Sequence, residues 1–158
     1  EIIAYTYSYL YDLHTTGLRY FTVYGPWGRP DMSYFIFTRK ILAKESITVF
    51  NHGNIKRDFT FIEDIISGTR SAIEKNYRCE IFNLGNHRSE NLMDLLSLIE
   101  SELGVKAIID FQPIQPGDIK ESFAELNYSV EKLGYSPEIN ILEGIPKFLS
   151  WYKKHYNK

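Results

Sequence analysis

The sequence predicts an α/β fold, because segments typical of strands alternate with segments typical of helices along its 158 residues. The clearest helix lies near 91–103, where apolar residues recur three and four positions apart and Gly104 supplies a C-terminal stop. The clearest strand is Leu18–Val23, which is rich in β-branched and aromatic residues and is expected to be buried. The length fits one domain with its own hydrophobic core.

The segments around this strand define its setting. Tyrosines alternate within Glu1–Asp12, which fits a strand by period, but we predict the end of a helix, because Asp12–Gly17 then forms a short loop. Tyr24–Asp31 is dense in Gly and Pro and is therefore expected to be a loop. Ser33 is expected to cap the next helix, whose core-facing residues would be Phe35, Ile36, Ile41 and Leu42.

The rest of the chain continues the alternation. We expect extended segments at 47–50, 57–61, 81–85 and 107–111, and helices at 62–74, 129–133 and from Leu142 to Tyr156. The helix at 62–74 is expected to bury one stripe, made of Ile62, Ile65, Ile66, Thr69 and Ile73. In the last helix, Leu142 is expected on the inner face and Pro146 near the first turn, since a deeper proline would break hydrogen bonds.

Composition and charge exclude several classes of protein. Hydrophobic residues make up 44% and charged residues 24%, which is typical of a globular domain. The formal net charge of -2 gives no electrostatic reason to expect nucleic acid or an anionic membrane as partner, and no apolar run is long enough to span a bilayer. The chain begins with neither Met nor a signal or transit peptide, so we expect it to be a piece of a longer protein.

Cysteine and histidine indicate no metal site. The lone cysteine, Cys79, excludes an internal disulfide and a multi-cysteine metal site, and we interpret it as a buried, inert thiol at a strand entrance. It fits a reducing compartment, so a cytoplasmic location is expected. The histidines lack a paired acid or metal-ligand spacing and are interpreted as solvated; they are His14, His52, His87 and His155.

Several segments resemble blocks of a known enzyme family. Leu18–Asp31 (LRYFTVYGPWGRPD) resembles the substrate-side strand and loop of the extended short-chain dehydrogenase/reductases, and among them the UDP-glucuronate 4-epimerases most of all. Arg57–Ile65 (RDFTFIEDI) resembles the block that follows. Later blocks match in the same order, at Phe82–Gly85, Gln115–Asp118, Lys132–Pro137 and Gly144–Tyr152. Each motif is weak alone, but together they cover nearly the whole chain in the right order.

The resemblance implies the C-terminal remainder of a Rossmann-type parallel sheet joined to a small α/β substrate-binding domain. Residues 1–31 would hold the tail of the catalytic helix with one strand and loop of the sheet, and 32–158 would be mainly the nucleotide-sugar-binding domain. The family's Gly-rich turn for the NAD pyrophosphate and its catalytic Tyr-x-x-x-Lys do not occur at their expected places. NAD is therefore expected to bind mainly to an absent N-terminal half, and this chain alone is expected to hold no catalytic residue and to be inactive.

A Tyr-x-x-x-Lys spacing does occur at Tyr128–Lys132. In the family this motif precedes the strand equivalent to Leu18–Val23, whereas here it follows that strand by over a hundred residues. We therefore interpret it as part of a surface helix that has the spacing by chance.

The resemblance implies that Arg57 binds the phosphates of a UDP-sugar. A planar guanidinium suits this role because it makes paired, charge-assisted hydrogen bonds with a pyrophosphate. The alternatives are a solvated arginine and a salt bridge with Asp58. The resemblance also implies that Arg29 orients the sugar or phosphate while the sugar rotates, and the alternative is a loop arginine in water.

Two further substrate contacts are implied in the same way. Thr22 is expected to contact the sugar carboxylate, or else to bond local backbone. Asp118 is expected to accept hydrogen bonds from ribose hydroxyls, or else to be an exposed loop acid. Gln115 stands where many relatives have an arginine, which weakens the case for a second phosphate clamp.

The remaining contacts involve strands. Thr48 and Phe50 are expected to pass the uracil, with plain strand packing as the alternative. Backbone groups of Tyr20 and Val23 are expected to face the nicotinamide amide of NAD, with packing in the β core as the alternative.

By resemblance, the intact enzyme would interconvert UDP-glucuronate and UDP-galacturonate at C4 through a 4-keto intermediate, with NAD taking and returning the hydride. Two alternatives stay open. One is another nucleotide-sugar dehydratase, decarboxylase or reductase, and the other is a non-catalytic nucleotide-binding or assembly module. The open edge of Leu18–Val23 also predicts a homodimer or a swapped assembly.

Overall fold

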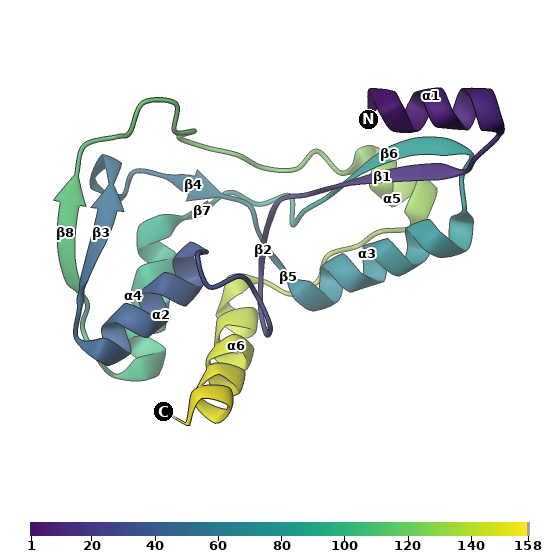
Figure 1. Ribbon diagram of the computed structural model, residues 1–158. Coiled ribbons are helices and arrows are strands. Elements are labelled where there is room, and N and C mark those ends of the chain that lie inside the picture. The colour runs from purple at the N-terminus through teal and green to yellow at the C-terminus, as the bar shows by residue number, and fades with distance from the viewer. Residues whose placement is uncertain (158) are drawn as a thin grey trace.

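Two lobes lie side by side and meet near the middle of the molecule (Figure 1). The computed structural model describes residues 1–157. The lobe that contains the N-terminus is built from α1 (Ile2–Tyr11), β1 (Thr15–Tyr20), α3 (Ile62–Lys75), β6 (Cys79–Leu84) and α5 (Asn127–Leu133). The other lobe is built from α2 (Ser33–Ala43), β3 (Ser46–Phe50), η1 (Asn51–Gly53), α4 (Leu92–Leu103) and β8 (Ile108–Gln112).

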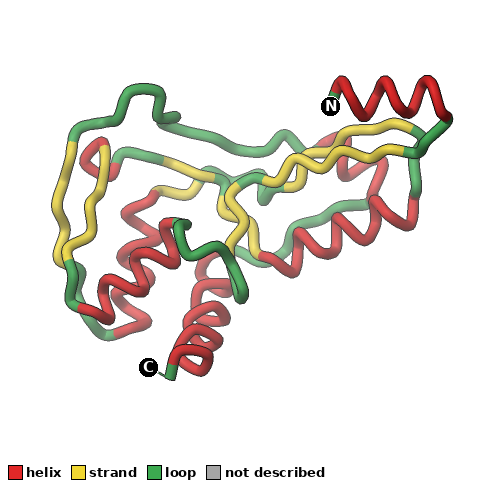
Figure 2. Tube along the Cα trace, in the orientation of Figure 1, coloured by secondary structure: helices red, strands yellow, loops and turns green. Residues whose placement is uncertain are grey.

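The junction between the lobes holds the short strands and the last helix. These are β2 (Thr22–Tyr24), β4 (Lys56–Arg57), β5 (Phe59–Phe61), β7 (Glu90–Asn91) and α6 (Ile141–Tyr156). In Figure 2, α1 and α3 lie on opposite sides of the β1–β6 pair. The alternation of strands and helices confirms the predicted α/β fold.

The strands pair in twos. β1 pairs with β6, β2 with β5 and β3 with β8, all in parallel, and β4 pairs antiparallel with β7. The prediction of one buried strand at Leu18–Val23 is wrong, because β1 is half-buried to exposed and the strand divides at Phe21. The Phe21 amide donates to Leu84 O at 3.2 Å and the Thr22 amide to Asp58 O at 3.0 Å, so the chain changes partner strand at this point.

Each lobe has its own hydrophobic core. The larger core packs α2, α4 and α6 against the strands, and its fully buried members include Tyr24, Tyr34, Phe59, Phe61 and Phe148. The smaller core lies between α3, α5 and β6, and its buried members include Ile65, Phe82, Leu84, Leu133 and Tyr135. β2 and β5 run between the two cores. At the junction, side chains of both cores therefore lie close to these strands.

All six predicted helices are confirmed, at α1 to α6. Asn91 caps α4 by accepting from the Met93 amide at 2.8 Å, and Gly104 ends it with a φ of 67°. The predicted cap of α2 is wrong, because Ser33 is already helical and Met32 at the N-cap makes no side-chain hydrogen bond. Among residues 1–157, no helix is both long and apolar enough to cross a membrane.

The buried faces of α3 and α6 differ from the predicted ones. Within the predicted α3 stripe Ile65 is buried, but Ile66 and Ile73 are 58% and 73% exposed. The helix also buries Asp64, Gly68 and Ala72. A side chain at Gly68 would collide with Leu84 and Tyr135, so close packing against that core sets the inner face. In α6, Leu142 is exposed and Pro146 lies inside the helix, in its second turn.

Candidate functional site

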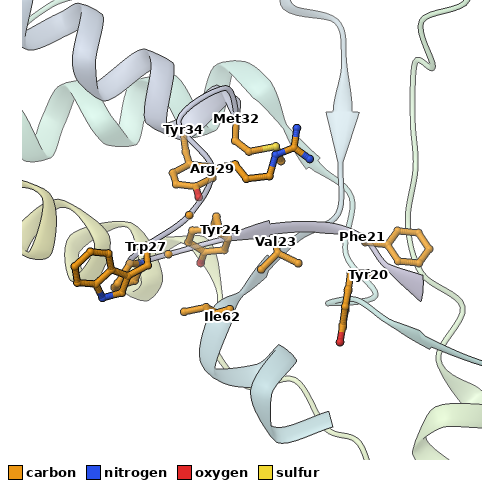
Figure 3. A pocket seen from close by; sticks show the side chains of 12 residues that line it. Tyr20, Phe21, Val23, Tyr24, Trp27, Arg29, Met32, Tyr34 and Ile62 are labelled. Carbon is orange, nitrogen blue, oxygen red and sulfur yellow. The ribbon is translucent and has the colours of Figure 1, made fainter. Parts of the chain in front are cut away.

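A cavity of about 540 Å³ lies at the junction of the lobes, where β2 ends (Figure 3). Its wall is formed by the end of β1, by β2, by the loop 25–31 and by the first residues of α2 and α3. Three residues that were predicted to bind substrate or cofactor line it together, namely Tyr20, Val23 and Arg29. Most other lining side chains are aromatic or apolar, among them Phe21, Tyr24, Tyr34 and Ile62.

Two glycines determine the path of the loop along the cavity. Gly25 has a φ of 137°, and a side chain there would come within 2.6 Å of Ile62 Cγ2. A side chain on Gly28 would collide with the hydroxyl of Tyr34. The backbone can lie directly against α3 and α2 at these positions only because glycine has no Cβ. This close approach places Arg29 at the edge of the cavity (Figure 3).

Arg29 is bound within its own loop. Its Nε donates to Asp31 Oδ1 at 3.1 Å, and Nη2 binds the other carboxylate oxygen. The hydrogen bonds raise the pKa of Arg29 and lower the pKa of Asp31. The Arg29 side chain is 76% exposed, so the guanidinium lies in solvent at the rim. Its contact with a sugar or phosphate stays a prediction.

Two tyrosines of the wall, Tyr24 and Tyr34, have a raised pKa. Burial raises the pKa of Tyr34 to about 12. Burial also raises the pKa of Tyr24, whose hydroxyl donates to Asn140 O at 3.1 Å. The Tyr34 hydroxyl has no hydrogen-bond partner among residues 1–157. Apart from Arg29 at the rim, the wall is therefore largely apolar, which suits a flat ring better than a phosphate group.

Arg57 and Asp118 form the second feature of the junction. Arg57 Nη2 donates to Asp118 Oδ1 at 2.9 Å, although the residues lie 61 positions apart in the sequence. Arg57 Nη1 donates to Lys56 O at 2.9 Å. The Arg57 and Asp118 side chains are 22% and 28% exposed, so the pair is partly buried but still reaches solvent. The alternative of a salt bridge with Asp58 is wrong, because the Asp58 carboxylate is buried and bound elsewhere.

Sequence analysis missed the role of Asp58. Its carboxylate is fully buried and accepts four hydrogen bonds of 2.7 to 3.0 Å. The donors are the amides of Asn86, His87 and Ala124 and the hydroxyl of Thr60. Asp58 lies between β4 and β5. Its hydrogen bonds connect this part of the chain to the turn after β6 and to the segment that follows Asp118. One signal in the sequence was an acid directly before the apolar run of β5, where a charge needs several partners.

Thr22 links the cavity to Arg57. Its neighbours Phe21 and Val23 line the cavity, and its amide donates to the carbonyl of Asp58, the residue after Arg57. Thr22 itself is half-buried. Thr22, Arg57 and Asp118 do not line the cavity themselves, and the hydrogen bond between Thr22 and Asp58 connects the cavity wall to the residue next to Arg57.

Thr48 and Phe50 lie in another part of the molecule. Both belong to β3, where they stand opposite Asp110 and Gln112 of β8 in the lobe that lacks the N-terminus (Figure 1). Thr48 is exposed and Phe50 is half-buried. Neither is among the described residues that line the cavity, so the structure does not bring them together with Tyr20, Val23 and Arg29.

The cavity wall fits a nicotinamide ring in its apolar character, through Tyr20, Val23 and Ile62. The Tyr20 hydroxyl lies 3.1 Å from Thr69 Oγ1, and the Val23 amide donates to Phe21 O at 3.0 Å, so both groups already have partners within the chain. A Gly-rich turn for the pyrophosphate of NAD does not occur in this sequence. Contact between this wall and the nicotinamide ring stays a prediction.

Tyr128 and Lys132 lie on α5, outside the cavity. The Tyr128 hydroxyl donates to Glu80 Oε2 at 2.8 Å, and this hydrogen bond raises the pKa of Tyr128. A tyrosine that acts as a general base needs the opposite shift, toward neutral pH. The exposed position and the raised pKa support the interpretation of this motif as part of a surface helix.

The part of the chain that the structure describes holds no group of three or more His, Cys, Asp or Glu side chains arranged to bind a metal ion. Cys79 begins β6, as predicted, but is half-buried rather than buried. Its sulfur accepts a weak hydrogen bond from Thr15 Oγ1 at 3.5 Å.

Comparison with known proteins gives a consistent result. An uncharacterized protein of Methanocaldococcus jannaschii is 46% identical over 152 residues, which cover 96% of this chain and 47% of that protein. UDP-glucuronate 4-epimerase 3 of Arabidopsis thaliana is 40% identical over 174 residues, which cover 99% of this chain and 40% of that protein. The crystal structure of the UDP-glucuronic acid 4-epimerase of Bacillus cereus, in complex with UDP-glucuronic acid and NAD, matches with a TM-score of 0.91 and 32% identity.

That match covers 98% of this chain and 50% of the Bacillus cereus chain, so the chain spans about half the length of the relatives it matches. A model of the NAD dependent epimerase/dehydratase family matches residues 1–85, more than half of the sequence. The chain therefore belongs to the NAD-dependent epimerase/dehydratase family.

Proposed function

We propose that this chain is the substrate-binding part of an NAD-dependent nucleotide-sugar epimerase that interconverts UDP-glucuronate and UDP-galacturonate at C4. Five UDP-glucuronate 4-epimerases of Arabidopsis thaliana, 38% to 40% identical across nearly the whole chain, support this substrate. The observation that carries the proposal is the partly buried Arg57–Asp118 pair, which the hydrogen bond between Asp58 and Thr22 connects to the strand that lines an apolar cavity. Catalysis belongs to a longer protein, and the chain alone supplies binding and orientation.

Arg57 is the proposed phosphate ligand. Of the five N–H donors of its guanidinium, one binds Asp118 Oδ1 and one binds Lys56 O, which leaves the rest of the fork for phosphate oxygens. The two bonds hold the planar group in place before a ligand arrives, so little side-chain entropy is lost on binding. Asp118 keeps its second carboxylate oxygen for a ribose hydroxyl.

The sugar is proposed to enter the cavity. Arg57, which would hold the diphosphate, is followed by Asp58, whose carbonyl accepts a hydrogen bond from the Thr22 amide. The neighbours of Thr22 on either side, Phe21 and Val23, line the cavity. The sugar that follows the diphosphate can therefore extend along β2. Thr22 and Arg29 are the polar groups that this path places near a sugar carboxylate.

When bound, NAD supplies reversible hydride transfer at C4 of the sugar. The contribution of this chain is the apolar wall of Tyr20, Val23 and Ile62 against the ring, and the grip of Arg57 on the diphosphate. The cavity gives the sugar room to turn between the two hydride transfers. Tyr24 and Tyr34 of the wall are poorly suited to act as a general base, because the pKa of each is shifted upward.

Calorimetric titration of UDP tests the phosphate site. Arg57→Ala is expected to weaken UDP binding about tenfold or more, because a hydrogen bond to a charged group contributes roughly 1.5–3 kcal/mol. Arg57→Lys keeps the charge but loses the fork, so its affinity should lie between the two. Arg70→Ala is the matched control, since Arg70 pairs with Glu74 on the exposed face of α3. Equal affinity for UDP in wild type and Arg57→Ala would contradict the assignment.

Analysis of the reaction product distinguishes a 4-epimerase from a decarboxylase or a dehydratase of the same family. The longer protein, incubated with NAD and UDP-glucuronate, is expected to yield UDP-galacturonate, whereas the 158-residue chain is expected to yield none. A pentose or a dehydrated sugar as product would indicate a decarboxylase or a dehydratase instead. UDP binding without turnover in the longer protein would indicate a non-catalytic module. We place the reaction in the cytoplasm, where a reducing environment keeps a single thiol such as Cys79 reduced.

A further inference from the structure

Trp27 has an unusual position in the loop beside the cavity. Its backbone is left-handed, with a φ of 61°, which is uncommon for a residue with a large side chain. Trp27 lines the cavity and is 76% exposed, and in Figure 3 its ring is directed away from Arg29 and toward α6. There it meets Trp151 at a centroid distance of 5.3 Å and His155 at 4.8 Å, and the rings of Trp151 and His155 are stacked on each other.

Three helices therefore contact three successive parts of one loop. Gly25 lies against Ile62 of α3, and Gly28 lies against Tyr34 of α2. Between these two backbone contacts, Trp27 reaches α6 through its side chain. The left-handed backbone at position 27 directs the ring outward to α6, and the contacts there offset the conformational cost of that backbone.

We propose that Trp27 is a positioning residue for the sugar site, and that its packing on Trp151 and His155 fixes the loop that carries Arg29. The proposal rests on the proposed function, because it assigns the loop 25–31 to the sugar part of the nucleotide sugar. According to the proposal, the last turns of α6 influence sugar binding although they do not line the cavity.

The anchor can be removed without unfolding α6. Buried residues on the other face of the helix, including Ile145, Phe148 and Tyr152, hold it in the larger core. His155 is exposed and lies in the last turn. Loss of the His155 or Trp27 ring is therefore expected to free the loop while the helix stays packed.

The test compares two ligands in the intact protein. Trp27→Ala is expected to weaken UDP-glucuronate binding roughly tenfold and His155→Ala roughly fivefold. In both variants UDP binding should change less than about twofold. UDP binds at Arg57, whereas only the sugar depends on the loop. Trp27→Phe should restore most of the lost affinity, since a phenyl ring can still pack on α6. Lys154→Ala, next to His155 on an exposed position, is the matched control and should leave both affinities unchanged.

A double-mutant cycle identifies the route. If His155 acts through Trp27, adding His155→Ala to Trp27→Ala should cause no further loss of UDP-glucuronate affinity. Thermal unfolding of each variant establishes that the protein is folded.

Three outcomes overturn the proposal. The first is unchanged UDP-glucuronate affinity in folded Trp27→Ala, and the second is an equal loss of affinity for UDP and UDP-glucuronate. Full additivity of the two substitutions is the third. In each of these cases UDP binding at Arg57 can still stand. Absence of UDP binding in the unsubstituted protein would overturn the proposed function as well.

Discussion

The carboxylate of Asp58 accepts hydrogen bonds from three backbone amides and one hydroxyl in a site closed to solvent. We expect Asp58→Asn to lower the free energy of unfolding by about 2–4 kcal/mol, because the amide presents N–H donors to amides that need an acceptor. Urea denaturation followed by circular dichroism measures this loss. Asp94→Asn, at an exposed position in the first turn of α4, should cost less than about 1 kcal/mol. A similar loss in both variants would contradict the assigned role.

Glu100 gives the stability a dependence on pH. Burial raises the pKa of Glu100, but hydrogen bonds from Lys106 and from the Ala107 amide outweigh it and leave the pKa below its ordinary value. The folded state therefore prefers the ionised form. Its contribution to stability is present above the ordinary carboxyl pKa and is lost as the pH falls through the lowered folded value.

Glu100→Gln is accordingly expected to reduce stability at pH 7 and to flatten its fall under acid. Denaturation midpoints between pH 3 and pH 7 measure both effects. Glu102→Gln, on the exposed side of the same helix, is the control. An unchanged acid slope in Glu100→Gln would show that other carboxylates cause the loss.

At the scale of single elements, Gly28 tests how tightly the cavity loop is built. Gly28→Ala is expected to destabilise the protein by about 1–3 kcal/mol, because the new methyl group collides with the buried Tyr34 hydroxyl. Tyr34→Phe removes that oxygen and should recover part of the loss in the double variant. Gly104→Ala is a contrasting control, since its site is open but has a φ of 67°, so its cost of about 1 kcal/mol should be independent of Tyr34. Thermal unfolding of the variants decides between these outcomes.

Helix ends were predictable from the sequence to different degrees. The C-terminal stop at Gly104 is confirmed, because a left-handed residue after a helix favours glycine, and Gly134 ends α5 in the same way. The cap at Ser33 is wrong because the chain enters α2 one residue earlier, from Met32. The α3 stripe is confirmed at Ile65 and wrong at Ile66 and Ile73, because single apolar residues are also common on the exposed side of a helix.

At the scale of the whole molecule, apolar residues remain at the surface of one lobe. On α1, Ile2, Ile3 and Tyr9 are exposed, and on α3, Ile66 and Ile73 are exposed. Exposed apolar patches of this kind favour association. We expect a homodimer or a swapped assembly, so light scattering should give about twice the 18.5 kDa mass of one chain.

A substitution on the exposed face of α3 tests the same expectation. Ile73→Lys should shift the mass toward one chain, because a charge there must be desolvated on association. Ser67→Lys adds the same charge to an exposed position that is already polar and should leave the mass unchanged. A monodisperse monomer for the unsubstituted chain would contradict the prediction.

The sequence by itself determined the α/β alternation and the family, because periodicity, turn residues and ordered motifs are local properties. The resemblance also singled out Arg57 and Asp118 as candidate substrate contacts, each independently of the other. Only the tertiary structure decided that they pair across 61 positions, that Asp58 joins the segments around them, and that Trp27 reaches α6. These outcomes depend on which distant segments pack together, and packing is set by contacts that no local pattern records.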